Sequence, residues 1–121
     1  CRLQWVELGI DRELYVPALA AVTGVQRSWE ELEKVGARIW NLNRMFWIRE
    51  NEGFGREWDL PAPRFYEEAP KTGVTAGQIT RLEDVHKLLD MYYEQRGWSS
   101  NGIPTPATLE KLGLAELAQT L

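Results

Sequence analysis

The sequence has few of the residues from which most catalytic and metal sites are built. Its 121 residues include one cysteine, Cys1, and one histidine, His86. One cysteine cannot form an internal disulfide, which fits a reducing compartment and leads us to expect a cytoplasmic protein. Zinc sites need three or four ligands, and His86 has no other His or Cys at metal-ligand spacing. We therefore expect His86 to have a surface or packing role, and no catalytic residue can be assigned.

Long apolar runs and an excess of basic charge are also missing. No apolar stretch approaches the roughly 20 residues that a membrane span requires, and the first residues lack the pattern of a signal peptide. The net charge of -4 offers no basic surface for nucleic acid or anionic lipid. We expect neither nucleic acid nor a membrane as a partner.

The composition is that of a globular protein, with 44% hydrophobic and 26% charged residues. A chain of 121 residues has room for one domain with one core, and we assign residues 1–121 to a single domain. The chain begins with Cys1 and not with methionine. We expect it to be a fragment that begins inside a longer polypeptide.

The strongest local signal is a capping box at Ser28 to Glu31, in which each side chain can bond the other residue's amide. It predicts a helix that runs to about Glu50. Its apolar residues recur at three- and four-residue steps, which predicts a buried stripe made of Leu32, Val35, Ile39, Leu42 and Phe46. Between Ile39 and Ile48 apolar residues occur nearly all round, which predicts burial on every side.

Other helices are predicted from caps and stop signals. Asp11 is the expected N-cap of the first, but Pro17 must lie in the first turn, so the ordered helix begins at Tyr15. Gly24, Gly97 and Gly113 supply C-terminal stops. The further helices expected are Tyr15 to Gly24, Thr80 to Arg96 and Thr105 to Gly113, with Ala115 to Thr120 forming a last turn or two.

A long loop is predicted between the second and third helices. Glycine and proline recur throughout residues 51–78 and exclude regular structure of any length. Interspersed apolar side chains indicate that the loop is ordered: Phe54, Trp58, Leu60, Phe65 and Tyr66. The predicted fold is a single small all-α domain of about four or five helices with a long ordered Pro/Gly/aromatic loop.

Three groups of residues have both a structural and a functional interpretation. The six tryptophans could form a binding surface, but Trp29, Trp40, Phe46 and Tyr92 fall on or near core stripes, which favours packing. Paired carboxylates such as Glu30–Glu31 and Glu67–Glu68 are of the kind that glycosidases use for catalysis, but here they are expected on solvated faces of the protein. Arg38, Arg44 and Arg49 are expected to pair with carboxylates such as Glu50 or Asp59, the alternative being that one or two face absent domains.

A series of segments, in order along nearly the whole chain, resembles one known family. The most specific is the block Tyr92-Tyr93 with Arg96-Gly97-Trp98, followed by Gly-Ile-Pro-Thr. The other segments are Val22–Gly24, Gly36–Phe46, Ile48–Glu50, Gly53–Phe54, Leu60–Pro61, Arg64–Phe65 and Leu109–Leu114. Together they are similar to the C-terminal domain of the tungsten-containing aldehyde:ferredoxin oxidoreductases.

The resemblance implies a parent enzyme that oxidises aldehydes to carboxylic acids. It implies tungsten (or molybdenum) on two pyranopterins, one 4Fe–4S cluster, and ferredoxin as the electron acceptor. Cys1 falls where the family has the fourth cluster cysteine, and it is the one metal ligand that the resemblance assigns. The family's pterin-binding and acid/base residues belong to segments absent here. Partners of this chain would be the remaining domains of the enzyme, ferredoxin and a small aldehyde, and the chain alone would be inactive without bound cofactors.

The sequence departs from the family where the long helix meets the loop. Trp47 stands where the family usually has Asn, and two extra residues precede Gly53. The subfamily and the aldehyde are therefore not fixed by the resemblance. The rival hypothesis is a free-standing helical module that binds a protein or ligand through exposed tryptophans.

Overall fold

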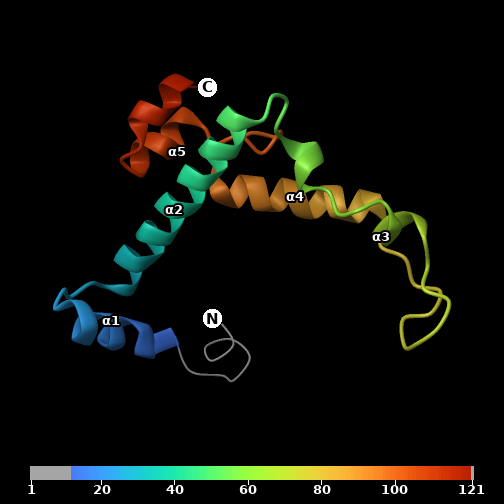
Figure 1. Ribbon diagram of the computed structural model, residues 1–121, viewed down its shortest axis with the longest axis horizontal. Coiled ribbons are helices and arrows are strands. Elements are labelled where there is room, and N and C mark those ends of the chain that lie inside the picture. The colour runs from blue at the N-terminus through green and yellow to red at the C-terminus, as the bar shows by residue number, and fades with distance from the viewer. Residues whose placement is uncertain (1–11, 121) are drawn as a thin grey trace. The chain divides into compact units, whose positions relative to one another are not determined.

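The computed structural model describes residues 12–120, which form an all-α structure as predicted (Figure 1). The α-helices in this part are α1 (Tyr15–Thr23), α2 (Trp29–Glu50), α3 (Arg64–Glu67), α4 (Leu82–Arg96) and α5 (Pro106–Lys111). Three short 3-10 segments accompany them: η2 (Arg12–Leu14), η3 (Arg56–Asp59) and η4 (Ala115–Thr120). The described residues contain no strand, only an isolated bridge between Trp98 and Pro104.

The chain forms two compact units, residues 1–39 and residues 40–121, and the boundary lies within α2. The assignment of residues 1–121 to one domain with one core stays a prediction. Cys1 and the expected N-cap Asp11 lie outside the described residues. No helix in the described part of the chain is both long enough and apolar enough to cross a membrane.

The first unit contains two of the predicted helix caps, Gly24 and the capping box at Ser28 to Glu31. α1 begins at Tyr15 with Pro17 in its first turn, and Gly24 ends it in the left-handed conformation at φ 70°. The capping box is confirmed, because the Ser28 amide donates to the Glu31 carboxylate over 2.7 Å and the Glu31 amide donates to the Ser28 hydroxyl over 3.2 Å. Local chemistry thus fixes the start of α2.

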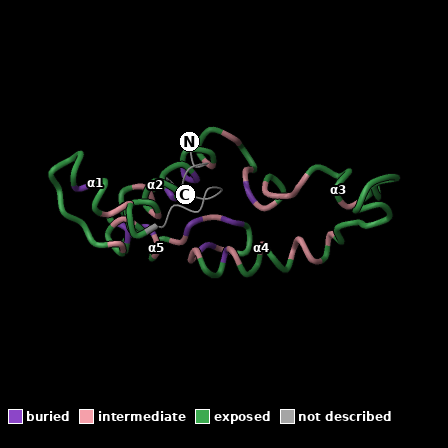
Figure 2. Tube along the Cα trace, turned by 90° about the horizontal axis from the view of Figure 1, so that it is seen from below, coloured by how far each residue is buried: buried purple, intermediate pink, exposed green. Residues whose placement is uncertain are grey.

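The core of the second unit is small and lies mainly between Tyr93 and Leu112 (Figure 2). The C-terminal half of α2 crosses the C-terminal half of α4 (Figure 1). The buried hydrophobic residues here are Met45, Tyr93, Trp98, Leu109 and Leu112. The core of this unit therefore combines residues of α2, α4 and α5 with Trp98 of the turn that joins α4 to α5.

The apolar stripe predicted on α2 is mostly exposed. Val35, Ile39, Leu42 and Phe46 are 38%, 57%, 50% and 50% exposed, and only Leu32 is half-buried. α2 instead buries Asn41, Arg44 and Met45. The expectation that residues 39–48 are buried on every side is therefore wrong for this chain. The reason is that the residues present cover only one face of α2, the face that carries polar groups.

The ends of the later helices follow the predicted signals. Gly97 ends α4 at φ 68°, and the Thr105 hydroxyl caps α5 by accepting from the Thr108 amide over 3.3 Å, with Pro106 next to it. Between α2 and α4, η3 and α3 interrupt a segment for which no regular structure was predicted. Pro63 lies at the start of α3, where a missing N–H is tolerated.

Candidate functional site

The second unit carries an open aromatic groove of about 610 Å³. We define the aromatic groove by the residues that line it: Trp40, Asn43, Arg44, Phe46 and Trp47 of α2, and Phe54, Trp58 and Asp59 of the following segment. Trp47 stacks on Phe54 with ring centroids 6.2 Å apart, and Phe54 lies 5.1 Å from Trp58. The groove is therefore an ordered set of rings from two segments.

The rings of the aromatic groove are half exposed. Trp40 and Trp47 are each 49% exposed, Phe46 is 50% exposed and Trp58 is 55% exposed. The prediction that Trp40 and Phe46 pack in the core is therefore wrong for this chain. Large apolar surfaces that remain open on a protein usually mark a place where something else binds.

An ion pair between the buried Arg44 and the partly buried Asp59 forms the polar part of the groove. Arg44 donates from Nη1 and Nη2 to the two carboxylate oxygens of Asp59 over 2.7 and 2.5 Å, and from Nε to the Gly102 carbonyl over 2.8 Å. Its guanidinium also lies 4.6 Å from the centre of the Phe54 ring. Since both charges of the pair are matched, the groove offers its occupant an apolar wall and no unpaired charge from these two groups.

Tyr93 of α4 completes the polar cluster. Its hydroxyl donates to Asp59 over 2.5 Å. Burial acts to raise the pKa of Asp59, but the hydrogen bonds from Arg44 and Tyr93 outweigh it and leave that pKa below its usual value. Burial and the Asp59 carboxylate raise the pKa of Tyr93. The cluster therefore contains an ionised carboxylate and a neutral phenol.

Arg56, the first residue of η3, joins that segment to α4 and to the following turn. It donates to His86 Nδ1 over 3.2 Å, to the His86 carbonyl over 2.8 Å, to Asp90 over 2.6 Å and to the Ser100 carbonyl over 3.0 Å. Its backbone amide donates to the Asn101 side chain over 3.0 Å. These bonds fix η3, which carries Trp58 and Asp59 of the groove.

Two further hydrogen bonds connect α2 with α4 and its following turn. Trp40 Nε1 donates to the Tyr92 hydroxyl over 2.7 Å, and Trp98 Nε1 donates to the buried side chain of Asn41 over 2.9 Å. These contacts explain why Asn41 is buried in α2 although it is polar, because a buried amide is tolerated when it is bonded.

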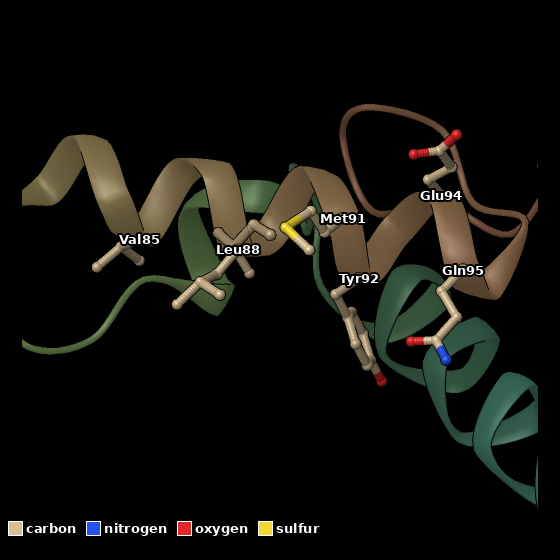
Figure 3. Close-up of a pocket in the computed structure, with 7 residues that line it drawn as sticks. Val85, Leu88, Met91, Tyr92, Glu94 and Gln95 are labelled. Atoms are coloured by element: carbon tan, nitrogen blue, oxygen red, sulfur yellow. The ribbon is translucent and has the colours of Figure 1, made fainter.

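A second hollow, lined mainly by apolar residues, lies on α4; in Figure 3 Val85, Leu88, Tyr92 and Gln95 extend below the helix, and Glu94 extends above it. It measures about 720 Å³ and is lined by Val85, Leu88, Leu89, Met91, Tyr92, Glu94 and Gln95. Leu88 and Met91 are 65% and 67% exposed. Tyr92 lies in this hollow while its hydroxyl holds Trp40 of the aromatic groove.

The sequence-predicted site residues have different outcomes. The pairing predicted for Arg44 and Arg49 is confirmed, since Arg44 binds Asp59 and Arg49 binds Glu50 over 2.7 Å. Arg38 is exposed, and its role stays a prediction. His86 is half-buried and accepts from Arg56. Glu30, Glu31, Glu67 and Glu68 are exposed, as expected for solvated carboxylates.

Sequence reasoning missed Arg56 and the part played by Tyr93. Arg56 lies among glycines in the predicted loop, and the groups that its side chain binds are 30 to 44 residues away in the chain. No local pattern points to such distant contacts. The nearest signal is the Tyr92–Tyr93 pair near the end of a helix, but this pair indicates core packing and a family resemblance, and it does not predict the bond from Tyr93 to Asp59.

The described residues do not form a ligand set for a metal cluster. Among residues 12–120 there is no cysteine and no group of three or more His, Cys, Asp or Glu placed to hold a metal ion. Iron–sulfur clusters are bound mainly through thiolates, so this part of the chain does not fit such a cluster. Cys1, the one predicted ligand, lies outside the described residues.

A comparison with protein families matches residues 1–114 to the family described as "Aldehyde ferredoxin oxidoreductase, domains 2 & 3". The chain is 35% identical over 108 residues to a tungsten-containing aldehyde ferredoxin oxidoreductase of Pyrococcus furiosus, a match that covers 89% of this chain and 17% of that protein. The corresponding protein of Thermococcus kodakarensis is 34% identical over the same shares. The chain thus spans about a sixth of the length of these relatives.

Two other matches have different names. An aliphatic sulfonate oxidoreductase, WOR-like subunit, of Pyrococcus furiosus is 32% identical over 102 residues, which are 82% of this chain and 16% of that protein. Among solved structures, the active site complex BamBC of benzoyl coenzyme A reductase, in complex with 1,5 dienoyl-CoA, superposes with a TM-score of 0.67 at 31% identity. That match covers 88% of this chain and 14% of the other.

Proposed function

The chain belongs to the aldehyde ferredoxin oxidoreductase family, and on this basis we propose that it is one part of a tungsten enzyme that oxidises aldehydes to carboxylic acids with ferredoxin as electron acceptor. The named relatives with the higher identities are tungsten-containing aldehyde enzymes. The sulfonate and benzoyl coenzyme A relatives have lower identities to the chain. An aldehyde is therefore the substrate class that we favour, in a cytoplasmic enzyme.

The exposure of the aromatic groove is the main support for the role that we propose for this chain within the enzyme. A set of tryptophan rings that is ordered by stacking and hydrogen bonds, yet half open, is suited to packing against a further protein surface. We assign this part of the chain to the scaffold: it packs against the remaining domains and contributes no catalytic residue among residues 12–120.

The tungsten centre would supply the oxidation chemistry when bound, and a 4Fe–4S cluster would carry the electrons. The contribution that these residues make is to hold packed surfaces in place. Arg44, Asp59 and Tyr93 fix the floor of the aromatic groove, and Arg56 fixes η3 beside it. These bonds cross between segments that are far apart in the sequence, so the groove keeps its shape before any other domain packs on it.

Cys1 is the one residue that we propose as a cluster ligand, on the resemblance alone. In the intact polypeptide, Cys1→Ser should reduce the iron bound per chain and change the electron paramagnetic resonance signal of the reduced cluster, because a thiolate ligand is replaced by a hydroxyl. Cys1→Ala should do the same. If both variants kept the wild-type iron content and signal, Cys1 would not be a ligand.

The proposed function is tested by preparing the longest natural polypeptide that contains these residues, without oxygen, and measuring bound tungsten and aldehyde-dependent reduction of ferredoxin. We expect both. If the gene encoded no upstream cluster cysteines and the purified protein bound no metal, the rival hypothesis of a tryptophan-lined binding module would replace this one. The open aromatic groove is the feature that would then need a separate partner.

A further inference from the structure

The contact between Arg56 and His86 shows which nitrogen of the His86 imidazole carries the proton. Arginine has only donors and stays protonated at all ordinary pH values. Since Arg56 Nε donates to His86 Nδ1 over 3.2 Å, that ring nitrogen must present a lone pair. The contact therefore exists only with a neutral imidazole that carries its proton on Nε2.

We propose that His86 and Arg56 form an acid-sensitive latch, which strengthens the attachment of η3 to α4 while the imidazole is neutral and weakens it when the imidazole is protonated. Protonation at Nδ1 removes the acceptor and places a second positive charge beside the guanidinium. Histidine is the side chain that changes charge between about pH 5 and 8. The latch is a property of this fold and does not depend on the proposed enzymatic function.

The surroundings of His86 determine whether the added charge can be compensated. From η3 the charged groups are Arg56, Glu57 and Asp59, and Asp59 is held by Arg44. On α4, Glu83 pairs with Lys87 over 2.7 Å, Asp84 pairs with Arg81 over 2.7 Å, and Asp90 holds Arg56 over 2.6 Å. The turn of residues 99–104 carries no titratable side chain. Asp59, Glu83, Asp84 and Asp90 therefore already have cationic partners, and Glu57 is exposed to solvent.

Opening of the latch would act on the aromatic groove. Arg56 begins η3, and the two groove residues Trp58 and Asp59 lie two and three positions later. Arg56 itself is largely buried, with 16% of its side chain exposed. Loss of the His86 contact removes one of the bonds that fix this residue, so η3 and the Trp58 wall should open more often at acidic pH.

Hydrogen exchange by mass spectrometry on the intact protein tests the latch, with rates corrected for the pH dependence of intrinsic exchange. In the wild type, protection of a peptide covering residues 55–60 should fall about tenfold between about pH 8 and 5.5. Protection of a peptide covering α5 should change little. His86→Gln, whose side-chain carbonyl can accept but cannot be protonated, should keep its protection at both pH values.

A second variant separates the latch from a general loosening of η3. Asp90→Asn weakens another bond of Arg56 but leaves His86 in place, so its protection should be lower throughout while the pH dependence persists. His86→Lys should resemble the acidic wild type at both pH values. If His86→Gln lost protection with the same pH dependence as the wild type, or if the α5 peptide lost protection equally, the latch would be rejected.

Discussion

Arg44 of α2 and Asp59 of η3 are joined by a forked ion pair with N–O distances of 2.7 and 2.5 Å. Only 9% of the Arg44 side chain is exposed, against 24% of Asp59. A fork of this kind fixes the orientation of both groups as well as their separation. It ties the segment after α2 back onto that helix and sets the floor of the aromatic groove.

Replacement of Arg44 by Ala should lower the free energy of unfolding by about 3 kcal/mol, because it leaves a largely buried carboxylate without its cation. Urea unfolding measures this. The matched control is Arg49→Ala on the same helix. Arg49 pairs with Glu50, and the two side chains are 63% and 47% exposed, respectively. The control should change stability by less than about 1 kcal/mol. If both variants lost the same free energy of unfolding, the forked pair would contribute no more to stability than the exposed pair.

The Asp59 carboxyl predicts a pH dependence of stability. Its pKa is lower in the folded protein than the ordinary value of 3.8, so its stabilising effect is complete above that value and is lost as the pH falls through the folded value. Stability should therefore fall on acidification below about pH 4. In Asp59→Asn this acid-dependent part should be missing, although the variant is less stable at neutral pH. Urea midpoints between about pH 6 and 3 give the comparison.

Gly102 is a position where a side chain should not be tolerated. Its φ is 73°, and an added Cβ would meet Arg44 Nη2 and the phenol carbon of Tyr93. We expect Gly102→Ala to cost about 3 kcal/mol, since backbone strain is added to a clash with the buried cluster. Gly53→Ala is the control: its φ is 75° and its Cβ would meet nothing. The control should cost only about 1 kcal/mol in thermal or urea unfolding. A smaller loss for Gly102→Ala than for the control would contradict the packing described.

The parts of the fold that depend on local chemistry could be predicted from the sequence. The capping box at Ser28, the left-handed Gly24 and Gly97, and the Thr105–Pro106 start of α5 are all decided by residues within a few positions. The partner of Arg44 was also within reach, because Asp59 was a nearby carboxylate in the loop that follows the same helix.

The buried face of α2 could not be predicted. The three- and four-residue spacing pointed to the stripe of Leu32, Val35, Ile39, Leu42 and Phe46. Between Ile39 and Ile48, however, apolar residues occur nearly all round the helix, so the spacing does not single out the face that is buried. The structure buries Asn41 and Arg44, and the reason is a set of partners supplied by distant residues such as Trp98 and Gly102. The bonds from Arg56 to His86 and Asp90 could not be predicted for the same reason, because these partners are distant in the sequence.

The exposed rings of the aromatic groove lead to a prediction about association. A fragment limited to residues 1–121 should associate as its concentration rises, because contact between molecules buries the half-exposed tryptophan rings. A double variant, Trp47→Glu with Trp58→Glu, should weaken that association, as measured by sedimentation at several dilutions. Val74→Glu is the control, since Val74 is 100% exposed and lies outside the groove. If the control weakened association as much as the double variant, the groove would not be the surface responsible.

The proposed role of these residues is that of scaffold within a tungsten enzyme that oxidises aldehydes. It is tested most directly by measuring tungsten per chain, together with aldehyde-dependent ferredoxin reduction, in the longest natural polypeptide that contains them, purified without oxygen. We expect bound tungsten and a ferredoxin reduction that requires aldehyde. A well-folded, complete polypeptide with no tungsten and no such activity after expression with a tungsten supply would contradict this role.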